Sequence, residues 1–481
     1  MDEWAIWGFL IAVSGLVLAS GVTVHAVLWK RDSRAVIAWV GLAWLAPFLG
    51  GIVYLCLGIN RIKRKAAGLE RRTSWIADET LPLNAQDLQQ AKKFSSEHPN
   101  LIGLAKAGQK LTGLPLQPGN SVEVLVDGDQ AFPAMIEAID SARRSVSLLS
   151  YIFDCDRAGE KFLDALIRAH ARGVQVRVLI DDVGSKYSRP NMVHQLKAAG
   201  LTAESFLPTR VPRLPTYSNL RNHRKILVVD GRIGFTGGTN IREGHCLALQ
   251  PTEPVQCLHF RLQGPVVSQL QSVFAVDWAF ATSENISGDD WFPEITRAGT
   301  VWARGVEHGP DEHFERLSDL MAAALASARQ NVRIVTPYFL PNASLIQALN
   351  VTAMRGVAVD IYLPSASNIA LVQWAAMAQL WQILEKGCRV YCTPPPFDHT
   401  KLMIVDGLWA LIGSTNWDPR SLRLNFEFNV ECYDQHLADS LNEIVDAKAR
   451  SARELKLADV NGRSFVSRLR DGLARLLTPY L

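Results

Sequence analysis

The feature that most constrains the fold of this chain is a short string that occurs twice, at residues 223–230 and 399–406. Each copy reads histidine, a variable residue, lysine, four apolar residues and aspartate. Each is followed by a glycine and a small polar segment, 237–240 after the first copy and 413–416 after the second. One His-x-Lys triplet arises easily by chance, but two copies of the whole string indicate an internal duplication. The chain therefore has to fold into two equivalent units that carry one copy each.

The residue types in each copy suit chemistry on an anionic phosphodiester. The apolar run after the lysine predicts a buried strand. Side chains two positions apart on a strand share a face, so His223 points with Lys225 and His399 with Lys401. A lysine neutralises phosphate oxygens as a point charge, and a histidine can act as nucleophile or proton donor near neutral pH.

The aspartates that close the two copies, Asp230 and Asp406, lie an odd number of residues from their histidines and should face away from them. We interpret both as structural members of the catalytic motif that hold the strand end or the turn. Each copy thus predicts two functional side chains on one face and one structural carboxylate.

Strand and helix patterns alternate from residue 122 onward, which predicts an α/β fold. We predict four regions: a membrane anchor at 1–65, a connector at 66–119, a first half at 120–300, and a second half at 301–481. The connector is polar and helix-prone, and we interpret it as a spacer that lifts the α/β region off the membrane. The second half ends in an amphipathic helix, with apolar residues at helical spacing among arginines. This pattern suits a helix lying on anionic lipid or one packed on the domain.

Two apolar runs, residues 5–28 and 35–59, precede the connector. Each is long enough to cross a bilayer core, which takes about 20 helical residues. We therefore predict two transmembrane helices, and Pro47, Gly50 and Gly51 leave open that the second run is re-entrant instead. Basic residues follow both runs, so the positive-inside rule gives no single orientation. Free cysteines favour a cytoplasmic α/β region.

Composition narrows the class of protein further. A net charge of +3 over 481 residues gives no general case for a nucleic-acid binder. The 7 cysteines are scattered and odd in number, which favours free thiols over a disulfide framework. Cys388 and Cys392 precede His399, but no second pair of ligands is nearby in the sequence. We predict no metal and no cofactor.

Further segments carry a resemblance to a known family. They are Asn222-His223-Arg224-Lys225, Tyr151-Ile152-Phe153, Asp181-Asp182-Val183-Gly184-Ser185, Thr336-Pro337-Tyr338-Phe339-Leu340-Pro341 and Asn416-Trp417-Asp418-Pro419-Arg420-Ser421. With the doubled motif, they resemble the phospholipase D superfamily, and in particular bacterial cardiolipin synthases, over nearly the whole chain. The resemblance implies two duplicated phospholipase D-like α/β halves that share one active site, in a multi-pass protein of the bacterial inner membrane.

The resemblance also implies roles for the motif residues. His223 would be the nucleophile on phosphorus and His399 the acid for the leaving alcohol, although the two local sequences are too alike to assign these roles by themselves. A lysine and an asparagine from each half would hold the phosphate oxygens: Lys225, Lys401, Asn240 and Asn416.

A nucleophilic imidazole needs its second nitrogen held, often by a carboxylate. The resemblance makes Glu427 the partner of His399. In the first half, Cys257 stands where the family usually has an aspartate. The group that orients His223 therefore stays open between Glu253, a carbonyl and another group.

The function that the resemblance implies is phosphatidyl transfer, which makes cardiolipin and glycerol from two phosphatidylglycerol molecules through a phosphohistidine. The partners would be phosphatidylglycerol, other anionic phospholipids and a membrane, and not nucleic acid. The alternatives are a membrane-bound phospholipase D that yields phosphatidic acid and a membrane scaffold with a dead site. The basic loop 207–220 is a candidate for contact with lipid head groups, and an ordinary surface loop fits it equally well. The apolar segment 369–384 is better interpreted as core, with a surface that contacts acyl chains as the alternative. The sequence leaves the phosphatidyl acceptor and the oligomeric state open.

Overall fold

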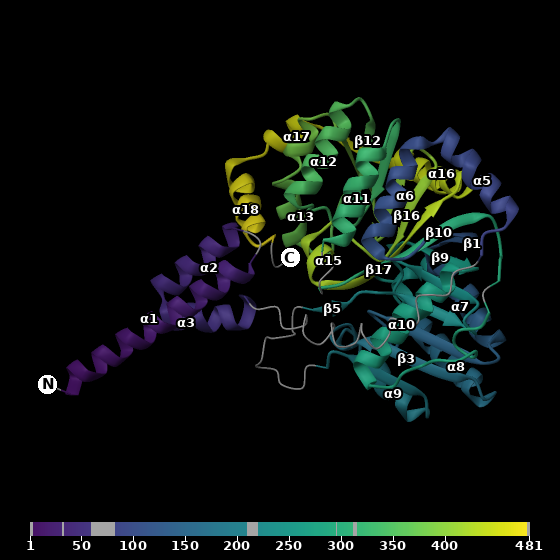
Figure 1. Ribbon diagram of the computed structural model, residues 1–481, viewed down its shortest axis with the longest axis horizontal. Coiled ribbons are helices and arrows are strands. Elements are labelled where there is room, and N and C mark those ends of the chain that lie inside the picture. Colours follow the sequence, from purple (N-terminus) through teal and green to yellow (C-terminus); the bar gives the residue numbers. More distant parts are fainter. Residues whose placement is uncertain are drawn as a thin grey trace. The chain divides into compact units, whose positions relative to one another are not determined.

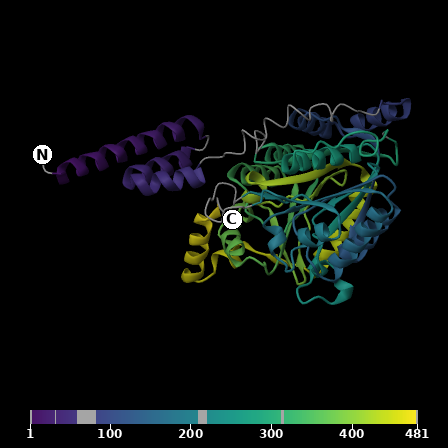
Figure 2. The same cartoon turned by 90° about the horizontal axis from the view of Figure 1, so that it is seen from below.

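The computed structural model describes residues 3–30, 33–58, 82–208, 220–294, 296–310 and 315–478. The chain divides into two compact units. Among the described residues, the N-terminal unit holds 3–58 and the α/β unit holds the rest (Figures 1 and 2).

The N-terminal unit contains one long helix and shorter helical pieces. The long helix is α1 (Glu3–Trp29). Its segment Ile6–Trp29 is the one helical stretch among the described residues that is long and apolar enough to cross a membrane. The second apolar run instead forms α2 (Ser33–Leu45), α3 (Pro47–Val53) and the π-helical turn η1 (Tyr54–Gly58). Proline disfavours helical backbone in the residue before it, and Ala46 leaves the helix with φ −143° and ψ 76°.

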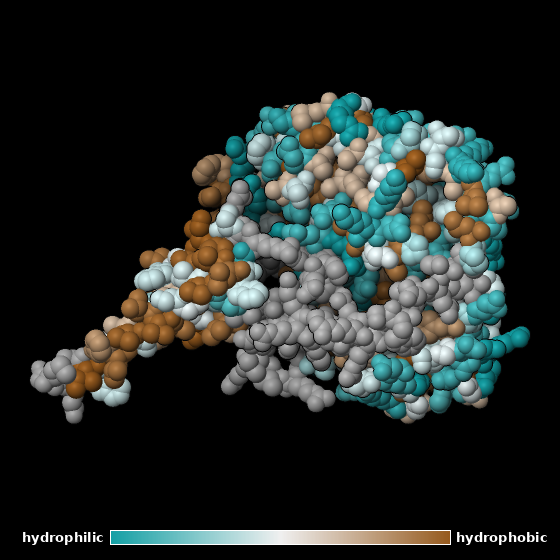
Figure 3. All heavy atoms as spheres, viewed as in Figure 1, coloured by the Kyte–Doolittle hydropathy of each residue, from teal (hydrophilic) through white to brown (hydrophobic). Residues whose placement is uncertain are grey.

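The prediction of two full transmembrane helices is therefore wrong. The 13 residues of α2 span about 20 Å, which is short of the ~30 Å of a bilayer core. Within the unit, α1 packs against α2 and α3 through the buried residues Ala19, Val22, Ala26, Ala43 and Tyr54. Much of the remaining surface of α1 is apolar and exposed (Figure 3).

The α/β unit is built on one 16-stranded mixed sheet. Its first half runs as β1 (Gln117–Val126), α7 (Asp127–Ser141), β2 (Ser145–Ser150), α8 (Arg157–Ala171), β3 (Gln175–Asp181), η2 (Gly184–Lys186), α9 (Met192–Ala198), β4 (Thr202–Phe206), β5 (Arg221–Asn222), β6 (Ile226–Val229), β7 (Ile233–Gly237), η3 (Glu243–His245), η4 (Leu247–Leu249), β8 (Val255–Gln256), β9 (Leu258–Gln263) and α10 (Val266–Thr282).

The second half repeats this order with additions at its C-terminal end. It runs as β10 (Val301–His308), α11 (Arg316–Ser327), β11 (Asn331–Val335), α12 (Ala343–Met354), β12 (Ala358–Pro364), α13 (Ala370–Met377), α14 (Trp381–Leu384), β13 (Arg389–Thr393), β14 (Phe397–Asp398), β15 (Leu402–Val405), β16 (Trp409–Gly413), α15 (Pro419–Arg423), β17 (Asn425–Tyr433), α16 (Gln435–Ser451), β18 (Arg453–Leu455), α17 (Leu457–Asn461) and α18 (Phe465–Leu476).

The strand order shows the duplication directly. From the centre outward, the first half has the order β1-β9-β7-β6-β2-β3-β4, and the second has β10-β17-β16-β15-β11-β12-β13 with β18 added at the edge. The central pair β1 and β10 is antiparallel. In each half, the two strands after the first helices run parallel, β2 with β3 and β11 with β12, as expected for strands joined by a helix. The prediction of a duplicated α/β fold is confirmed.

The segment predicted to be a spacer belongs to the α/β unit. It contains α5 (Ala85–Glu97) and α6 (Pro99–Thr112). Leu101 and Leu104 of α6 are fully buried in the apolar core of the second half, beside α11. The Asp87 carboxylate pairs with Arg297 at 2.5 Å. Burying these two leucines stabilises the fold by roughly 3–6 kcal/mol. The helices α5 and α6 are therefore part of the folded α/β unit and not a spacer.

The C-terminal helix α18 packs on α13 with its apolar face turned outward. Asp471 and Ala474 are buried, at 1% and 3% exposure. Asp471 accepts ion pairs from Arg463 and Arg470. The exposed apolar side chains of the helix are Phe465, Val466, Leu469, Leu473 and Leu476. The apolar periodicity therefore does not mark the packed face of this helix.

Candidate active site

Both histidine motifs lie where one half of the unit meets the other. The strands begin after the lysines, at β6 and β15, so each His-x-Lys segment is an extended lead-in. The His223 amide donates to the carbonyl of Phe426 at 2.9 Å, and the His399 amide donates to that of Gln256 at 2.7 Å. Each motif is thus bonded to the opposite half. The short pairings of β5 with β17 and β14 with β8 make the same cross-connection.

The variable residue of the first motif strengthens this connection. Arg224 is fully buried. Its guanidinium pairs with Asp277 of α10 at 2.7 Å and with Glu307 of β10 at 2.8 Å. Asp277 belongs to the first half and Glu307 to the second. Because an uncompensated buried charge is costly, the pair with Glu307 keeps the first motif fixed against the second half.

The two imidazoles face each other across one cleft. The ring centroids of His223 and His399 are 6.4 Å apart, and the rings are inclined at 78°. Tyr151 packs edge-on against His223 with a centroid distance of 5.1 Å. The cleft has a volume of about 830 Å³ and is lined by residues of both halves, including Asn240 and Asn416.

The lysines lie beside the histidines, and burial changes their acidity. The ammonium groups of Lys225 and Lys401 donate to the carbonyl oxygens of His223 and His399, at 2.7 and 2.6 Å. Burial lowers the pKa of Lys225 to about 7 and that of Lys401 to about 8, from an ordinary value of 10.5. An anion bound between these groups would favour their charged forms and raise both pKa values.

Glu427 contacts His223 and not His399, so the predicted pairing is wrong. The Nδ1 atom of His223 lies 3.0 Å from Oε1 of Glu427. The carboxylate is fully buried and also accepts hydrogen bonds from Ser414 Oγ and Asn425 Nδ2. Burial works to raise the pKa of Glu427, but the nearby His223 and Lys225 lower it overall. The physical reason is that each motif lies against a strand of the opposite half, so the second half supplies the group that orients the histidine of the first.

His399 has a different partner. Its Nδ1 atom lies 3.0 Å from the carbonyl oxygen of Gly238, which places the ring proton on Nδ1 because a carbonyl only accepts. Strand pairing puts Cys257 at the position that Glu427 holds in the other half. The Cys257 thiol contacts the His399 carbonyl oxygen at 3.4 Å. Within the part of the chain that the structure describes, no carboxylate lies at ion-pair distance from His399.

Position 238 is compatible only with glycine. A Cβ there would lie 2.6 Å from Cys257 Sγ and 2.9 Å from the His399 carbonyl oxygen. Its counterpart in the second half is Ser414, whose hydroxyl bonds Glu427. The two halves therefore differ at two equivalent positions: the first half has Gly238 and Cys257 where the second half has Ser414 and Glu427.

Burial lowers the pKa of His223 to about 4, although Glu427 acts in the opposite direction. Burial lowers the pKa of His399 well below 6.5, and Lys401 and His245 add to the effect. Both imidazoles are therefore neutral at pH 7, and each has Nδ1 engaged. This leaves Nε2 of each ring available to attack or to exchange a proton.

The two aspartates hold turns, in agreement with the structural role given to them. Asp230 accepts from the amides of Arg143, Arg144 and Ser145, and Asp406 accepts in the same way from Arg329, Gln330 and Asn331. Both aspartates have positive φ, 51° and 53°. Each therefore joins the end of its motif strand to the start of β2 or β11.

A family model described as cardiolipin synthase, phospholipase D-like domain, matches residues 135–278 and 321–448. The major cardiolipin synthase of Bacillus subtilis is 32% identical over 463 residues, covering 94% of this chain and 95% of that protein. The chain belongs to the cardiolipin synthase family. The resemblance inferred from the motifs is confirmed.

Other relatives agree with this membership. A cardiolipin synthase of Staphylococcus aureus is 30% identical over 465 residues, covering 94% of this chain and 92% of that protein. Phosphatidylserine synthase of Haemophilus influenzae, a solved structure, has a TM-score of 0.62 at 16% identity, covering 79% of this chain and 100% of that chain. At this identity, the structural likeness supports the fold alone.

Three residues of the cleft were not predicted as site residues from the sequence. Tyr151 and Tyr338 pack against the two histidines, with Tyr338 6.5 Å from His399 between ring centroids. His245 is buried, and its ring lies 6.2 Å from that of His399. The tyrosines stand in the segments that carry the family resemblance, which was the available signal. The sequence contains no comparable signal for His245. The loop 207–220, which was predicted as a candidate for lipid contact, lies mostly outside the described residues.

Proposed function

We propose that the protein is a phosphatidyltransferase that makes cardiolipin and glycerol from two phosphatidylglycerol molecules. The observation that carries the proposal is the meeting of His223 and His399, 6.4 Å apart between ring centroids, in one cleft of a cardiolipin synthase family member. Asn240 and Asn416 line this cleft, and the buried Lys225 and Lys401 lie beside the two histidines, which suits a phosphodiester anion. The donor would thus react where both halves contribute charge.

In the first step, Nε2 of His223 attacks the phosphorus of the donor lipid. The N–P bond forms as the P–O bond to the glycerol head group breaks, and His399 gives a proton to the leaving oxygen. In the second step, the hydroxyl of a second phosphatidylglycerol gives its proton to His399. Its oxygen bonds to phosphorus as the N–P bond breaks, which frees His223.

The lysines and asparagines would hold the nonbridging oxygens through both steps. Lys225 and Lys401 supply positive charge from one face of the phosphate, and Asn240 and Asn416 supply amide donors. The general acid must carry a proton on Nε2, and the bound phosphodiester raises the pKa of His399 toward that state by offsetting the lysine charges.

The difference between the two histidine environments supports His223 as the nucleophile. A phosphohistidine with a protonated Nδ1 is cationic, and the Glu427 carboxylate 3.0 Å away stabilises that charge. His399 has a neutral carbonyl at Nδ1. A carbonyl fixes the tautomer without making the imidazolium unduly stable, which suits a group that gives and takes a proton in turn.

The protein would act at the bacterial inner membrane. We assign α1 as a transmembrane helix and the run from α2 to η1 as a re-entrant segment, with the α/β unit in the cytoplasm. The outward apolar face of α18, flanked by Arg468 and Arg475, would rest on anionic lipid. A membrane-impermeant maleimide tests the orientation. We expect Cys155, a partly exposed thiol of the α/β unit, to be labelled only after permeabilisation; labelling in intact cells would reverse the assignment.

The proposed reaction is tested by giving the purified protein phosphatidylglycerol alone in liposomes and analysing the products. We expect cardiolipin and glycerol in equal amounts, and no turnover with His399→Ala. Phosphatidic acid without cardiolipin would identify a phospholipase D. Absence of turnover in the wild type under conditions where lipid binds would identify a scaffold. All the histidine, lysine and aspartate positions of both motifs are retained, which favours the enzyme over the scaffold.

A further inference from the structure

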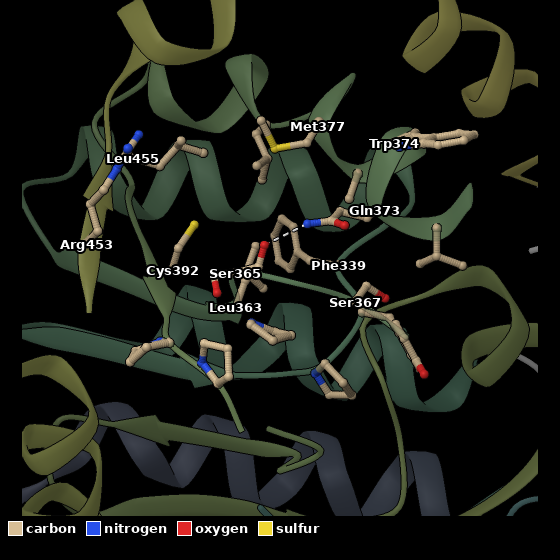
Figure 4. Close-up of a pocket in the computed structure, with 18 of the residues that line it drawn as sticks. Phe339, Leu363, Ser365, Ser367, Gln373, Trp374, Met377, Cys392, Arg453 and Leu455 are labelled. Atoms are coloured by element: carbon tan, nitrogen blue, oxygen red, sulfur yellow. Dashed lines mark hydrogen bonds between the residues drawn. The ribbon is translucent and has the colours of Figure 1, made fainter. Parts of the chain in front are cut away.

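A second cavity of about 610 Å³ lies beside the catalytic cleft. It is bounded by α13, β12 and β13, and Figure 4 shows its lining side chains. Its wall is mostly apolar, with contributions from Phe339, Leu363, Met377, Leu380 and Leu455. A cavity of this size falls within the ~300–1,000 Å³ of ordinary ligand sites, and an apolar wall favours an apolar ligand.

This cavity adjoins the catalytic cleft on the His399 side. Tyr338, Ser365, Ser367 and Val372 line both spaces. Tyr338 also packs edge-on to His399, with 6.5 Å between the ring centroids. Because the two spaces share these walls, a ligand with one end at His399 and the other end in the cavity would pass Tyr338.

Three arginines also line the cavity: Arg453, Arg463 and Arg470. Arg463 and Arg470 are ion-paired with Asp471, and Arg453 lies 3.3 Å from Asp459, so the arginines exceed their acidic partners by one. Figure 4 places Arg453 at one edge of the cavity and Trp374 at the opposite edge. The Arg470 guanidinium lies over the Trp374 ring at 4.4 Å, and the Arg453 side chain is 72% exposed. An apolar wall with a small excess of positive charge beside it suits the apolar chain of an anionic phospholipid.

We infer that this cavity, named here the α13 pocket, binds an acyl chain of the acceptor phospholipid. The inference rests on the proposed function. If His223 is the nucleophile, in-line displacement places the leaving glycerol and then the incoming hydroxyl on the opposite side of phosphorus, next to His399. The α13 pocket opens on that side. Holding the acceptor there raises its effective concentration over water, so the pocket decides between transfer and hydrolysis.

The test fills the pocket and measures how the phosphohistidine is partitioned. Met377→Trp places a larger ring in the α13 pocket. Met354→Trp makes the same change on α12 at a side chain that is 60% exposed and lies outside the pocket. Each variant receives dioleoyl-phosphatidylglycerol in mixed micelles, and the ratio of cardiolipin to phosphatidic acid is measured. A ratio is independent of the fraction of active enzyme.

We expect Met377→Trp to lower this ratio about tenfold. The indole ring fills the space of roughly two methylene groups of the acyl chain, and the burial free energy of those two groups corresponds to a change of about that size. Met354→Trp should leave the ratio unchanged. With dihexanoyl-phosphatidylglycerol as the acceptor, the difference between Met377→Trp and wild type should largely vanish. Cys392→Phe, which fills the pocket from β13, should reproduce the effect and serves if Met377→Trp does not fold.

The ratio staying at the wild-type value in both pocket variants would overturn the inference and leave the proposed function intact. So would an equal fall in the ratio with Met354→Trp. Failure of the wild type to make any cardiolipin is a different outcome, because it would refute the proposed function on which the pocket assignment depends.

Discussion

Replacing Glu427 by glutamine tests the carboxylate that contacts His223. The change keeps the shape and one acceptor oxygen but removes the charge. At 3.0 Å, a full charge pair with a cationic phosphohistidine is worth about 5 kcal/mol at an effective dielectric of ~20. The glutamine oxygen retains a neutral hydrogen bond to Nδ1, so we expect a net loss of about 3 kcal/mol of transition-state stabilisation. This corresponds to a decrease in kcat of roughly 100-fold.

The assay is the initial rate of cardiolipin formation from phosphatidylglycerol, with kcat and KM determined separately. KM should change little, because Glu427 is fully buried behind His223. The control is Glu253→Gln, which removes an exposed carboxylate of the cleft without touching His223, and it should stay within about threefold of wild type. Thermal unfolding of both variants checks that they are folded. A Glu427→Gln enzyme with near wild-type kcat, or one matched by Glu253→Gln, would refute the role given to this carboxylate.

Three further predictions concern the other half of the site, its stability and the membrane surface. Cys257→Asp places a carboxylate beside His399, at the position that Glu427 holds in the other half, and this negative charge raises the pKa of the His399 imidazole. The alkaline limb of the kcat/KM profile should therefore move up by about 1 pH unit. An unmoved limb would contradict the equivalence of position 257 with position 427. Lys401→Met removes a buried amine whose pKa burial lowers from 10.5 to about 8. The unfolded chain binds more protons in that interval, so the wild type should gain unfolding free energy relative to the variant between pH 8 and 10.5 in urea titrations. A constant difference would show that the folded and unfolded chains bind this proton equally, so that burial does not lower the pKa of Lys401. Leu469→Glu with Leu473→Glu should slow cardiolipin formation on anionic vesicles about three- to tenfold and leave turnover of monomeric dihexanoyl-phosphatidylglycerol unchanged, whereas an equal loss on both would mean a folding defect.

The doubled motif was enough to predict the fold class and the shared site. The apolar run after each lysine is a local signal for a buried strand, and its repetition indicates the duplication that the strand order shows. The crossed pairing of Glu427 with His223 is not local. It depends on which half supplies the strand behind each histidine, and two near-identical local sequences do not encode that choice.

The predictions that failed did so because composition was given more weight than packing. The run 35–59 is apolar throughout, yet one proline divides it into helices too short to span a bilayer. The connector is polar overall, yet Leu101 and Leu104 of α6 complete the core of the second half. For α18 the sequence left a lipid-facing helix and a packed helix both open. The helix packs on α13 through an aspartate with two arginine partners and an alanine, and its apolar stripe is exposed.

The central claim is that His223 carries the phosphatidyl group between donor and acceptor. The most direct measurement is to mix the protein with phosphatidylglycerol labelled in its phosphate, quench at alkaline pH where phosphohistidine survives, and locate the label by peptide mass spectrometry. We expect a label on the peptide that contains His223, more abundant in Glu253→Gln than in Glu427→Gln. A label on the His399 peptide, or cardiolipin formation with no label on either histidine at times shorter than one turnover, would contradict it.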